Sequence, residues 1–302
     1  MSKIDLHNNK KLSIVFLNFN RLHETRQTVD QLLQLCGRRT DIEIIAVDNG
    51  SNDGTAEFLA SQENIQAILL DENYGIAGYN AGFRQAKGDY ILVLDDDSCP
   101  KDASTLNQII DVFDQQPAIG VIACHIETPM GEAQWSWHLP PQPVAGSSPF
   151  FIGCGFAIRR NLFQEIGWYP EEFFLYQNEV EVAYQVRQRH FQIFYLPDCR
   201  VVHRGMPCQR PGWRRIYFPT RNTIWLIKRY YPQPKSTYMI ISRMMIGLIR
   251  SLQFGEFITY LRAVFDAYKQ PVKKQQLSPE ILKETSVFFR QNSIFHHLFK
   301  RA

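Results

Sequence analysis

The stretch GDYILVLDDDSCP, residues 88–100, joins a short apolar run to three consecutive carboxylates. Residues 90–94 are apolar without alternation, which is typical of a strand buried on both faces of a parallel sheet. In open sheets of this kind, ligands bind beyond the carboxyl ends of the strands. Asp95, Asp96 and Asp97 follow the run directly, so we expect them at such a binding edge.

Three adjacent carboxylates repel one another, and their desolvation is costly unless a cation lies between them. Oxygen ligands favour hard cations, and Mg²⁺ commonly shares its coordination shell with substrate phosphates. The stretch therefore predicts a site for Mg²⁺ or Mn²⁺ together with a phosphorylated substrate. The alternative is a solvated acidic turn that follows a core strand.

The sequence before this stretch alternates buried strands, polar loops and helices. Apolar runs at 12–17, 42–47 and 65–70 predict strands, and the spacing of apolar residues at 23–36 predicts a helix. A repeat of roughly 30 residues is typical of right-handed β–α–β units, which build an open, mostly parallel sheet. We therefore predict an α/β fold with helices flanking the sheet.

Polar residues after these strands suit a nucleotide. Asp48 ends the second predicted strand, where its carboxylate could accept hydrogen bonds from a base imide or from ribose hydroxyls. Gly75 and Gly78 would let backbone amides approach a phosphate at a helix start. Ordinary turn chemistry explains the same glycines, and the dinucleotide motif GxGxxG is absent.

Composition describes an ordinary folded protein. The chain has 302 residues, of which 45% are hydrophobic and 21% charged, with a net charge of +3. Its six cysteines form no CxxC pair and no zinc-ligand spacing, which favours reduced thiols in a cytoplasm. No stretch reaches the roughly 18 uncharged apolar residues of a membrane span. No nucleic-acid-binding module is recognisable, so we expect no nucleic-acid partner.

Three blocks in a fixed order carry a resemblance: SIVFLNFNR at 13–21, AVDNGSNDGT at 46–55 and ENYGIAGYNAGFRQAKGDYILVLDDDSCP at 72–100. They resemble the N-terminal half of inverting family 2 glycosyltransferases, with a further likeness to rhamnosyltransferase-like members at 221–232. The resemblance implies a GT-A fold, an open mostly parallel sheet flanked by helices, with a C-terminal helical extension. It also implies transfer of a sugar from a UDP- or dTDP-type donor to a hydroxyl of a glycan or lipid-linked acceptor in cell-surface polysaccharide synthesis.

The resemblance also implies roles for individual residues. Asp95 and Asp97 become the outer acids of a DxD motif that binds Mg²⁺ or Mn²⁺. His203 becomes a residue that faces the diphosphate or serves as a further metal ligand. The residues implied to bind the nucleotide sugar are Asn18, Asp48, Asn49, Gly75, Asn80, Asp95, Asp96 and Arg221. Many members have Pro-Thr-Tyr-Asn where this chain has Leu-Asn-Phe-Asn at 17–20, which leaves the choice between uridine and thymidine open.

Residues 167–181 resemble the family segment that ends in Glu-Asp-x-Asp, whose Asp after the first Glu is the general base. This chain reads Asn-Glu-Val-Glu at 178–181. A hydroxyl is a poor nucleophile at neutral pH, so a carboxylate must accept its proton as it attacks the anomeric carbon. Glu179 is therefore the candidate catalytic base, although its extra methylene moves the carboxylate by ~1 Å. The alternative is that Glu179 and Glu181 form the solvated face of a helix.

The difference between Asn-Glu-Val-Glu at 178–181 and the family's Glu-Asp-x-Asp motivates a second hypothesis from another class. In this hypothesis the chain is a non-catalytic nucleotide-sugar-binding partner subunit of a glycosyltransferase complex. A nucleotidyltransferase that makes the donor is a third hypothesis. It would need a phosphate loop rich in Gly and Lys or Arg after the first strand, and Asn-Phe-Asn-Arg at 18–21 is not such a loop.

Residues 199–255 carry charge of one sign. A strand is predicted at 191–196, followed by a turn and a second extended stretch at 201–205. Residues 199–255 hold eleven basic residues and no Asp or Glu, which favours an anionic partner. Arginines near Arg221 suit a leaving diphosphate, while 225–254 interleaves basic and apolar residues as an interfacial helix pair on anionic lipid does. A helical cap with a basic wet face explains the same pattern.

These patterns predict a domain boundary near residue 225. Residues 1–225 would form the GT-A domain, with a nucleotide-binding half at about 11–100 and an acceptor half at about 101–225. Residues 226–302 would form a helical, basic and apolar extension. We expect a cytoplasmic protein that is peripheral on the inner face of the plasma membrane.

Overall fold

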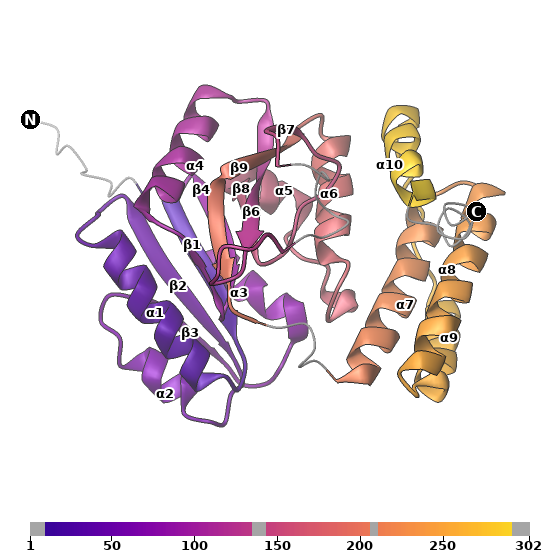
Figure 1. The fold of residues 1–302 in the computed structure, drawn as a ribbon, viewed down its shortest axis with the longest axis horizontal. Coiled ribbons are helices and arrows are strands. Elements are labelled where there is room, and N and C mark those ends of the chain that lie inside the picture. Colours follow the sequence, from indigo (N-terminus) through magenta and orange to yellow (C-terminus); the bar gives the residue numbers. More distant parts are fainter. Residues whose placement is uncertain (1–9, 135–142, 206–210, 292–302) are drawn as a thin grey trace, which may run out of the picture. The chain divides into compact units, whose positions relative to one another are not determined.

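The computed structural model describes residues 10–134, 143–205 and 211–291 (Figure 1). The chain divides into two compact units. The first contains Met1–Glu171 and Gln185–Gly205, and the second contains Glu172–Tyr184 and Met206–Ala302. The division falls within helix α6 (Asn178–Gln188).

The first unit is built on one open sheet with strand order β3-β2-β1-β4-β8-β6-β9-β5, and β7 pairs with β9 (Figure 1). The strands are β1 (Leu12–Asn18), β2 (Ile42–Asn49), β3 (Gln66–Leu70), β4 (Tyr90–Asp95), β5 (Ser98–Pro100), β6 (Ile119–Glu127), β7 (Gly146–Ser147), β8 (Gly155–Arg159) and β9 (Gln192–His203). The predicted α/β class with an open sheet is confirmed.

The parallel character predicted for the sheet holds in its first half. Strands β3, β2, β1 and β4 are all parallel neighbours. Strand β8 then runs antiparallel to both β4 and β6, while β6 and β9 are parallel and β5 and β7 are antiparallel to β9. The spacing of apolar residues indicates which strands are buried but not the direction in which each strand runs. The antiparallel direction of β8 could therefore not be predicted from the sequence.

Helices cover both faces of the sheet because side chains alternate along each strand. Ile14 and Phe16 of β1 belong to the core cluster that includes Val29 and Leu32 of α1. Between them, Val15 faces the opposite side, where it lies against Gly82 of α3. The helices of this unit are α1 (Leu22–Cys36), α2 (Thr55–Ala60), α3 (Tyr79–Gln85), α4 (Ala103–Gln115) and α5 (Arg160–Ile166), with a 3₁₀ turn η1 (Gly75–Gly78).

Strand register gathers three distant segments at one edge of the sheet. Leu94 of β4 pairs with Gly155, so the start of β8 lies beside the end of β4. Ser98 of β5 pairs with His203, which ends β9. The residues that follow β4, precede β8 and close β9 therefore share this edge.

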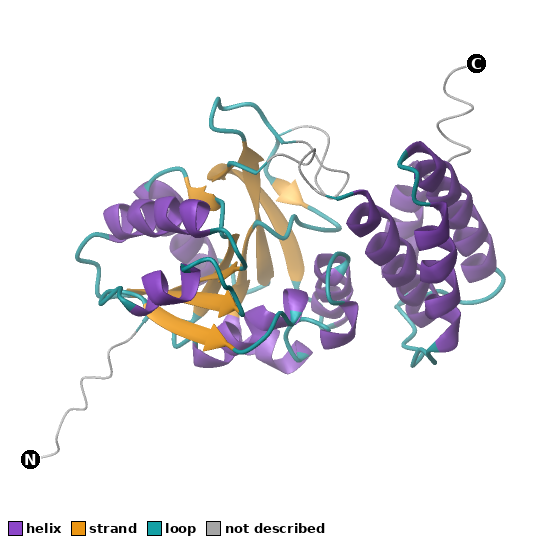
Figure 2. Ribbon diagram, turned by 90° about the horizontal axis from the view of Figure 1, so that it is seen from below, coloured by secondary structure: helices purple, strands orange, loops and turns teal. Residues whose placement is uncertain are grey.

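The second unit is helical (Figure 2). Its helices are α7 (Gly212–Tyr230), α8 (Lys235–Gln253), α9 (Phe257–Lys269) and α10 (Pro279–Gln291). Helix α7 packs on both α8 and α9, and the indole Nε1 of Trp225 donates a hydrogen bond to the Ala267 carbonyl at 3.2 Å. Residue 225 thus lies inside a continuous helix. Across the described ranges, each helix is too short or too polar to cross a membrane.

Candidate active site

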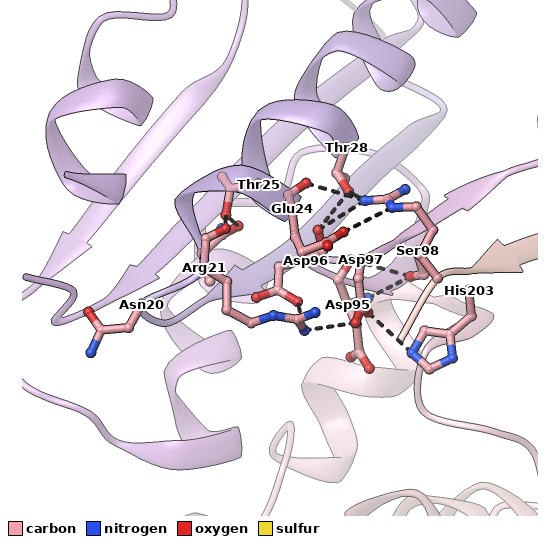
Figure 3. Close-up of polar contacts among 12 residues, drawn as sticks. Asn20, Arg21, Glu24, Thr25, Thr28, Asp95, Asp96, Asp97, Ser98 and His203 are labelled. Atoms are coloured by element: carbon pink, nitrogen blue, oxygen red, sulfur yellow. Dashed lines mark hydrogen bonds and ion pairs between the residues drawn. The ribbon is translucent and has the colours of Figure 1, made fainter. Parts of the chain in front are cut away.

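The three carboxylates form a tight turn where β4 ends (Figure 3). The backbone N–H of Asp95 donates to Oγ of Ser98 at 2.8 Å, which closes the turn. The hydroxyl of Tyr79 donates to Oδ1 of Asp95 at 3.0 Å and to the Leu94 carbonyl at 2.6 Å. Asp95 is partly exposed, whereas Asp96 and Asp97 are buried.

Arg21 and His203 converge on the buried acids (Figure 3). The Nη1 atom of Arg21 lies 2.7 Å from Oδ1 of Asp96 and 2.7 Å from Oδ2 of Asp97. On the other side, Nε2 of His203 lies 3.2 Å from Oδ1 of Asp97. The turn is therefore held by one cation and one imidazole from two different elements.

The orientation of His203 is set by Gln134. The amide Nε2 of Gln134 donates to the His203 carbonyl, so its Oε1, 2.9 Å from Nδ1 of the imidazole, accepts the Nδ1 proton. In the neutral ring, Nε2 then presents its lone pair toward Asp97. Two acceptors 3.2 Å apart need a positive charge between them, either a proton on Nε2 or a metal ion. The donor set therefore fits a divalent cation.

The pKa values of the two buried acids are shifted in opposite directions. Burial by itself raises the pKa of Asp97, but its ion pairs with His203 and Arg21 outweigh burial and hold that pKa well below the usual range. Burial dominates at Asp96 and raises its pKa well above the usual range, although Arg21 acts in the opposite direction. Asp97 is thus the carboxylate that stays anionic and suits a metal.

The segment after β9 completes the turn. The backbone N–H of Arg204 donates to the Asp97 carbonyl at 2.9 Å, and its guanidinium donates to Oγ1 of Thr28 at 2.6 Å. A Cβ atom on Gly205 would lie 2.4 Å from Oδ2 of Asp97. Only glycine lets the chain pass so close to the carboxylate.

Cys154 joins this edge from the start of β8. One ligand atom each of Asp95, Cys154 and His203 lie within 4.8 Å of one another, and the thiol and imidazole are buried. These three residues come from strands β4, β8 and β9 or the position next to them. A thiol is therefore part of the surroundings of the predicted metal site.

The nucleotide side of the site centres on Asp48. Its Oδ2 accepts from the Ser51 N–H at 2.9 Å. Its Oδ1 is buried and has no hydrogen-bond partner among the described residues. A buried carboxylate oxygen left in this way is costly unless a ligand donates to it. This geometry fits the predicted hydrogen bond from a base imide or a ribose hydroxyl.

Asn49 holds the loop that leads to Gly75. Its amide nitrogen donates to the Gly75 carbonyl at 3.0 Å, and its oxygen accepts from the Tyr74 N–H at 3.1 Å. A Cβ atom on Gly78 would lie 2.6 Å from that amide oxygen, so η1 can pack here only through a glycine. Gly75 itself has a positive φ of 60°.

Two other predicted binding residues are engaged inside the fold. Asn18 donates to the Val47 carbonyl at 3.1 Å and accepts from Oγ1 of Thr25 at 2.9 Å. Asn80 makes reciprocal hydrogen bonds with the backbone of Tyr169 at 3.0 and 3.1 Å. Both amides connect neighbouring elements, and their contact with a nucleotide stays a prediction.

Glu179 and Glu181 lie in the second unit, in the first turn of α6. Glu179 is partly buried. Glu181 is buried, with Nη1 of Arg229 3.1 Å from its Oε1 and a hydrogen bond from the Tyr230 hydroxyl. The predicted solvated face is thus wrong for Glu181, because this carboxylate ties α6 to α7. The catalytic role of Glu179 stays a prediction.

Arg221 also lies in the second unit. Its guanidinium lies over the Trp225 ring, 4.4 Å from the centroid, and donates to the Phe173 and Glu172 carbonyls at 2.8 and 3.2 Å. These contacts stabilise the packing of α7 in that unit. Binding of a diphosphate by Arg221 stays a prediction and would require a change in these contacts.

Three residues at the edge were not singled out from the sequence, namely Arg21, Tyr79 and Cys154. Arg21 had a usable signal, since a basic residue ending the loop after strand one can reach the acids of a neighbouring strand. Tyr79 and Cys154 carried no such signal, because both occur in apolar surroundings that are typical of core positions.

The family model for glycosyl transferase family 2 matches residues 13–181. The chain belongs to this family. A curated relative, the undecaprenyl-phosphate 4-deoxy-4-formamido-L-arabinose transferase of Yersinia pestis (strain Pestoides F), is 40% identical over 95 residues. That match covers 29% of this chain and 29% of the relative, so less than a third of the relative is represented.

Solved structures of glycosyltransferases share the fold of this family 2 member. S. aureus TarS 1–349 in complex with UDP-GlcNAc has a TM-score of 0.64 at 16% identity, covering 86% of this chain and 81% of that one. The mannosyltransferase PcManGT from Pyrobaculum calidifontis, in complex with GDP-Man and Mn²⁺, has a TM-score of 0.56 at 16% identity, with coverages of 92% and 79%. At this identity the likeness establishes the fold alone.

Proposed function

We propose that this chain is an inverting, metal-dependent glycosyltransferase. It moves a sugar from a nucleotide-diphosphate sugar of the UDP or dTDP type to a hydroxyl of a glycan or lipid-linked acceptor. The observation that carries the proposal is the pairing of Oδ1 of Asp97 with Nε2 of His203 at 3.2 Å, where a divalent cation can take the place of a proton between the two atoms. The buried, unpartnered Oδ1 of Asp48 on the same sheet supports a nucleotide there.

On the donor side, we assign metal binding and nucleotide binding to separate sets of residues. Asp95, Asp97 and His203 would hold Mg²⁺ or Mn²⁺, which when bound supplies positive charge to the leaving diphosphate. Asp48 accepts a hydrogen bond from the base or ribose, while Asn49 and Gly75 shape the adjoining loop. Asn18, Asn80, Asp96 and Arg221 complete the proposed nucleotide-sugar set.

On the acceptor side, we assign the proton transfer to Glu179. The carboxylate of Glu179 takes the proton from the acceptor hydroxyl as its oxygen attacks the anomeric carbon, which inverts the configuration. Glu181 is less suited to this role, because Arg229 and Tyr230 already hold its carboxylate.

We propose in addition that residues 1–225 form the GT-A domain and that residues 226–302 form an extension.

An exposed apolar surface on the extension supports a membrane partner. Helices α8 and α9 pack together and expose large apolar side chains at helical spacing. On α8 these are Tyr238, Ile241, Met245, Leu248, Ile249 and Leu252, and on α9 they are Phe257, Ile258, Leu261, Phe265 and Tyr268. Exposed basic residues accompany them, namely Arg250, Arg262 and Lys269. We propose that this α8–α9 face binds an anionic membrane, on the inner face of the plasma membrane, where a lipid-linked acceptor resides.

The catalytic proposal is tested by donor hydrolysis. A panel of UDP-, dTDP- and GDP-sugars is incubated with the full chain and Mn²⁺, and release of the nucleoside diphosphate is measured. We expect slow turnover of one donor, abolished by Asp97→Ala and retained in Asp30→Ala, which alters an exposed acid on α1. Tight donor binding without turnover on any acceptor, unchanged by Glu179→Gln, would instead favour a non-catalytic partner subunit.

The membrane proposal is tested by co-sedimentation with vesicles. We expect the chain to sediment with phosphatidylglycerol-containing vesicles and far less with pure phosphatidylcholine. Ile258→Glu combined with Phe265→Glu should weaken binding by about 100-fold or more, since each buried apolar side chain contributes about 1.5–3 kcal/mol. Leu69→Glu, an exposed apolar position on β3, is the control. A dimer in analytical ultracentrifugation that the double substitution dissolves would assign the face to a second copy.

A further inference from the structure

We propose that Asp95, Cys154 and His203 form a site for a thiophilic divalent cation such as Zn²⁺, overlapping the Mg²⁺ or Mn²⁺ site. This inference rests on the proposed function in one respect, which is that the Zn²⁺ site overlaps the site proposed there for Mg²⁺ or Mn²⁺. Its consequence is regulation of that site, since a thiophilic ion bound through Cys154 excludes the hard ion and lowers turnover.

The three residues are brought together by the sheet. Antiparallel pairing of Leu94 with Gly155 sets the start of β8 against the end of β4, next to Asp95. Pairing of Ser98 with His203 sets the end of β9 at the same edge. One carboxylate oxygen, one sulfur and one imidazole nitrogen thus lie within 4.8 Å of one another.

The ligand types match zinc. Zn²⁺ is bound by thiolate at about 2.3 Å, imidazole at about 2.0–2.1 Å and carboxylate at about 2.0–2.2 Å. Tetrahedral geometry at these bond lengths places ligand atoms roughly 3.5 Å apart. Side-chain movements of about 1 Å therefore close the site around an ion. Three protein ligands with one open position are the pattern of a zinc site that remains accessible to small molecules.

Groups around the ligands already orient two of them. Gln134 accepts the Nδ1 proton of His203, which leaves Nε2 as the ligand atom. The Tyr79 hydroxyl donates to Oδ1 of Asp95 at 3.0 Å. Such partners are what metal-binding imidazoles and carboxylates usually have.

Cys154 decides which ions the edge accepts. Without it, Asp95, Asp97 and His203 offer oxygen and nitrogen, which suit Mg²⁺ and Mn²⁺. With it, the site offers a soft ligand that those ions use poorly and that Zn²⁺, Cd²⁺ and Co²⁺ bind well. Cys154 also belongs to the core cluster, so a purely structural role is the competing explanation.

Cobalt absorption distinguishes the two explanations. The full chain, freed of metal by chelator, is titrated with Co²⁺, and the near-ultraviolet charge-transfer absorption of a cobalt thiolate is recorded. We expect the band in the wild type and in Cys99→Ala, a control at another buried thiol near the edge. The band should be lost in both Cys154→Ser and Cys154→Ala, with folding of each variant checked by circular dichroism.

Affinities complete the test. In competition with a chromogenic chelator, Cys154→Ser should weaken Zn²⁺ binding by about 100-fold or more, because loss of even an outer-shell partner costs 10–100-fold. Mn²⁺ affinity, measured by electron paramagnetic resonance, should stay within about twofold. Absence of the cobalt band in the wild type, or its persistence in both Cys154 variants, would overturn the inference. A cobalt band without Mn²⁺ binding or donor turnover would uphold this inference while refuting the proposed function.

Discussion

The Nη1 atom of Arg21 lies 2.7 Å from Oδ2 of Asp97, and the same nitrogen contacts Oδ1 of Asp96 at 2.7 Å. A single guanidinium therefore contacts both buried acids beside the proposed metal site. A metal ion that binds Asp97 would neutralise the carboxylate that Arg21 contacts, so Arg21 and the ion act on the same charge.

Arg21→Ala is expected to make stability depend on metal. Removing hydrogen bonds to a charged group costs about 1.5–3 kcal/mol, which should lower Tm by several degrees in the presence of chelator. Mn²⁺ should then raise Tm more in the variant than in the wild type, because it replaces the missing charge. Arg26→Ala, in the helix α1 that begins directly after Arg21, is the control, because the Arg26 guanidinium lies over Phe58. Equal Mn²⁺-induced shifts in variant and wild type would contradict the shared-charge account.

Asp48→Asn is expected to weaken nucleotide binding. The substitution keeps the shape but removes the charge from the buried Oδ1 that awaits a donor. The loss of one charged hydrogen bond corresponds to about a 10- to 100-fold weaker Kd for the nucleoside diphosphate, measured calorimetrically. Asp30→Asn, at an exposed position of α1, should bind as the wild type does. Unchanged binding in Asp48→Asn would remove Asp48 from the nucleotide site.

Gly78→Ala is expected to destabilise the loop on the nucleotide side. Its backbone is helical, so the new methyl group is strained only by its neighbours, Oδ1 of Asn49 at 2.6 Å and Cδ1 of Leu17 at 3.0 Å. Overpacking of this kind costs about 1–3 kcal/mol, which urea unfolding can measure. Gly146→Ala, where nothing lies within 4 Å, should leave the unfolding free energy nearly unchanged.

Glu179→Gln and Glu181→Gln are expected to separate chemistry from stability. The first should lower sugar transfer by about 10²- to 10⁴-fold while donor Kd and Tm stay near the wild type. The second should lower the free energy of unfolding by about 1–3 kcal/mol, because Arg229 and Tyr230 lose a charged partner. Near-normal transfer by Glu179→Gln, together with loss of transfer in a folded Glu181→Gln, would exchange the two roles.

His125 is expected to give stability a pH dependence near neutrality. Its Nδ1 lies 2.7 Å from the Tyr195 hydroxyl, and burial lowers its pKa, with Arg200 and Lys101 acting in the same direction and Glu127 opposing them. The unfolded chain therefore binds a proton first, at a pKa of about 6.5. The stabilising contribution is present above that pH and is lost as pH falls through the lower folded value. Unfolding at pH 7.5 and 5.5 should show a smaller loss in His125→Gln, and parallel losses would contradict this.

Local patterns predicted the first half of the sheet well. The run at 90–94 forms β4, and the alternation of strand, loop and helix from Leu12 to Asp95 appears as predicted. These elements depend on burial at the core, which apolar spacing reports directly. Asp48 and the three carboxylates lie at or directly after the ends of β2 and β4, so their placement at one edge required only the rule for parallel strands.

Other features depend on partners that lie far away in the sequence. Two extended segments were expected where β9 runs unbroken from Gln192 to His203. The turn expected between these segments is an irregularity at 197–199 in the pairing with β6, where the register shifts between Cys124 and His125. A bulge accommodates a residue without a donor N–H, so the strand continues through Pro197.

The site residues missed by sequence reasoning show the same limit. Contact of Arg21 with Asp96 spans 75 positions, and the reversal of β8 that brings Cys154 to the edge leaves no trace in apolar spacing. Contacts between side chains that strand pairing brings together from distant parts of the sequence can be identified only when the pairing of the strands is known.

Asp95, Cys154 and His203 stand where hydrogen-bonded strands of one sheet end or begin. The backbone positions of these three residues are fixed when the domain folds, so the proposed ion would require only small side-chain adjustments and no loop closure. Exchange of surface loops with other family members is therefore expected to change the sugar specificity of the proposed enzyme and to leave the proposed ion-binding site unchanged.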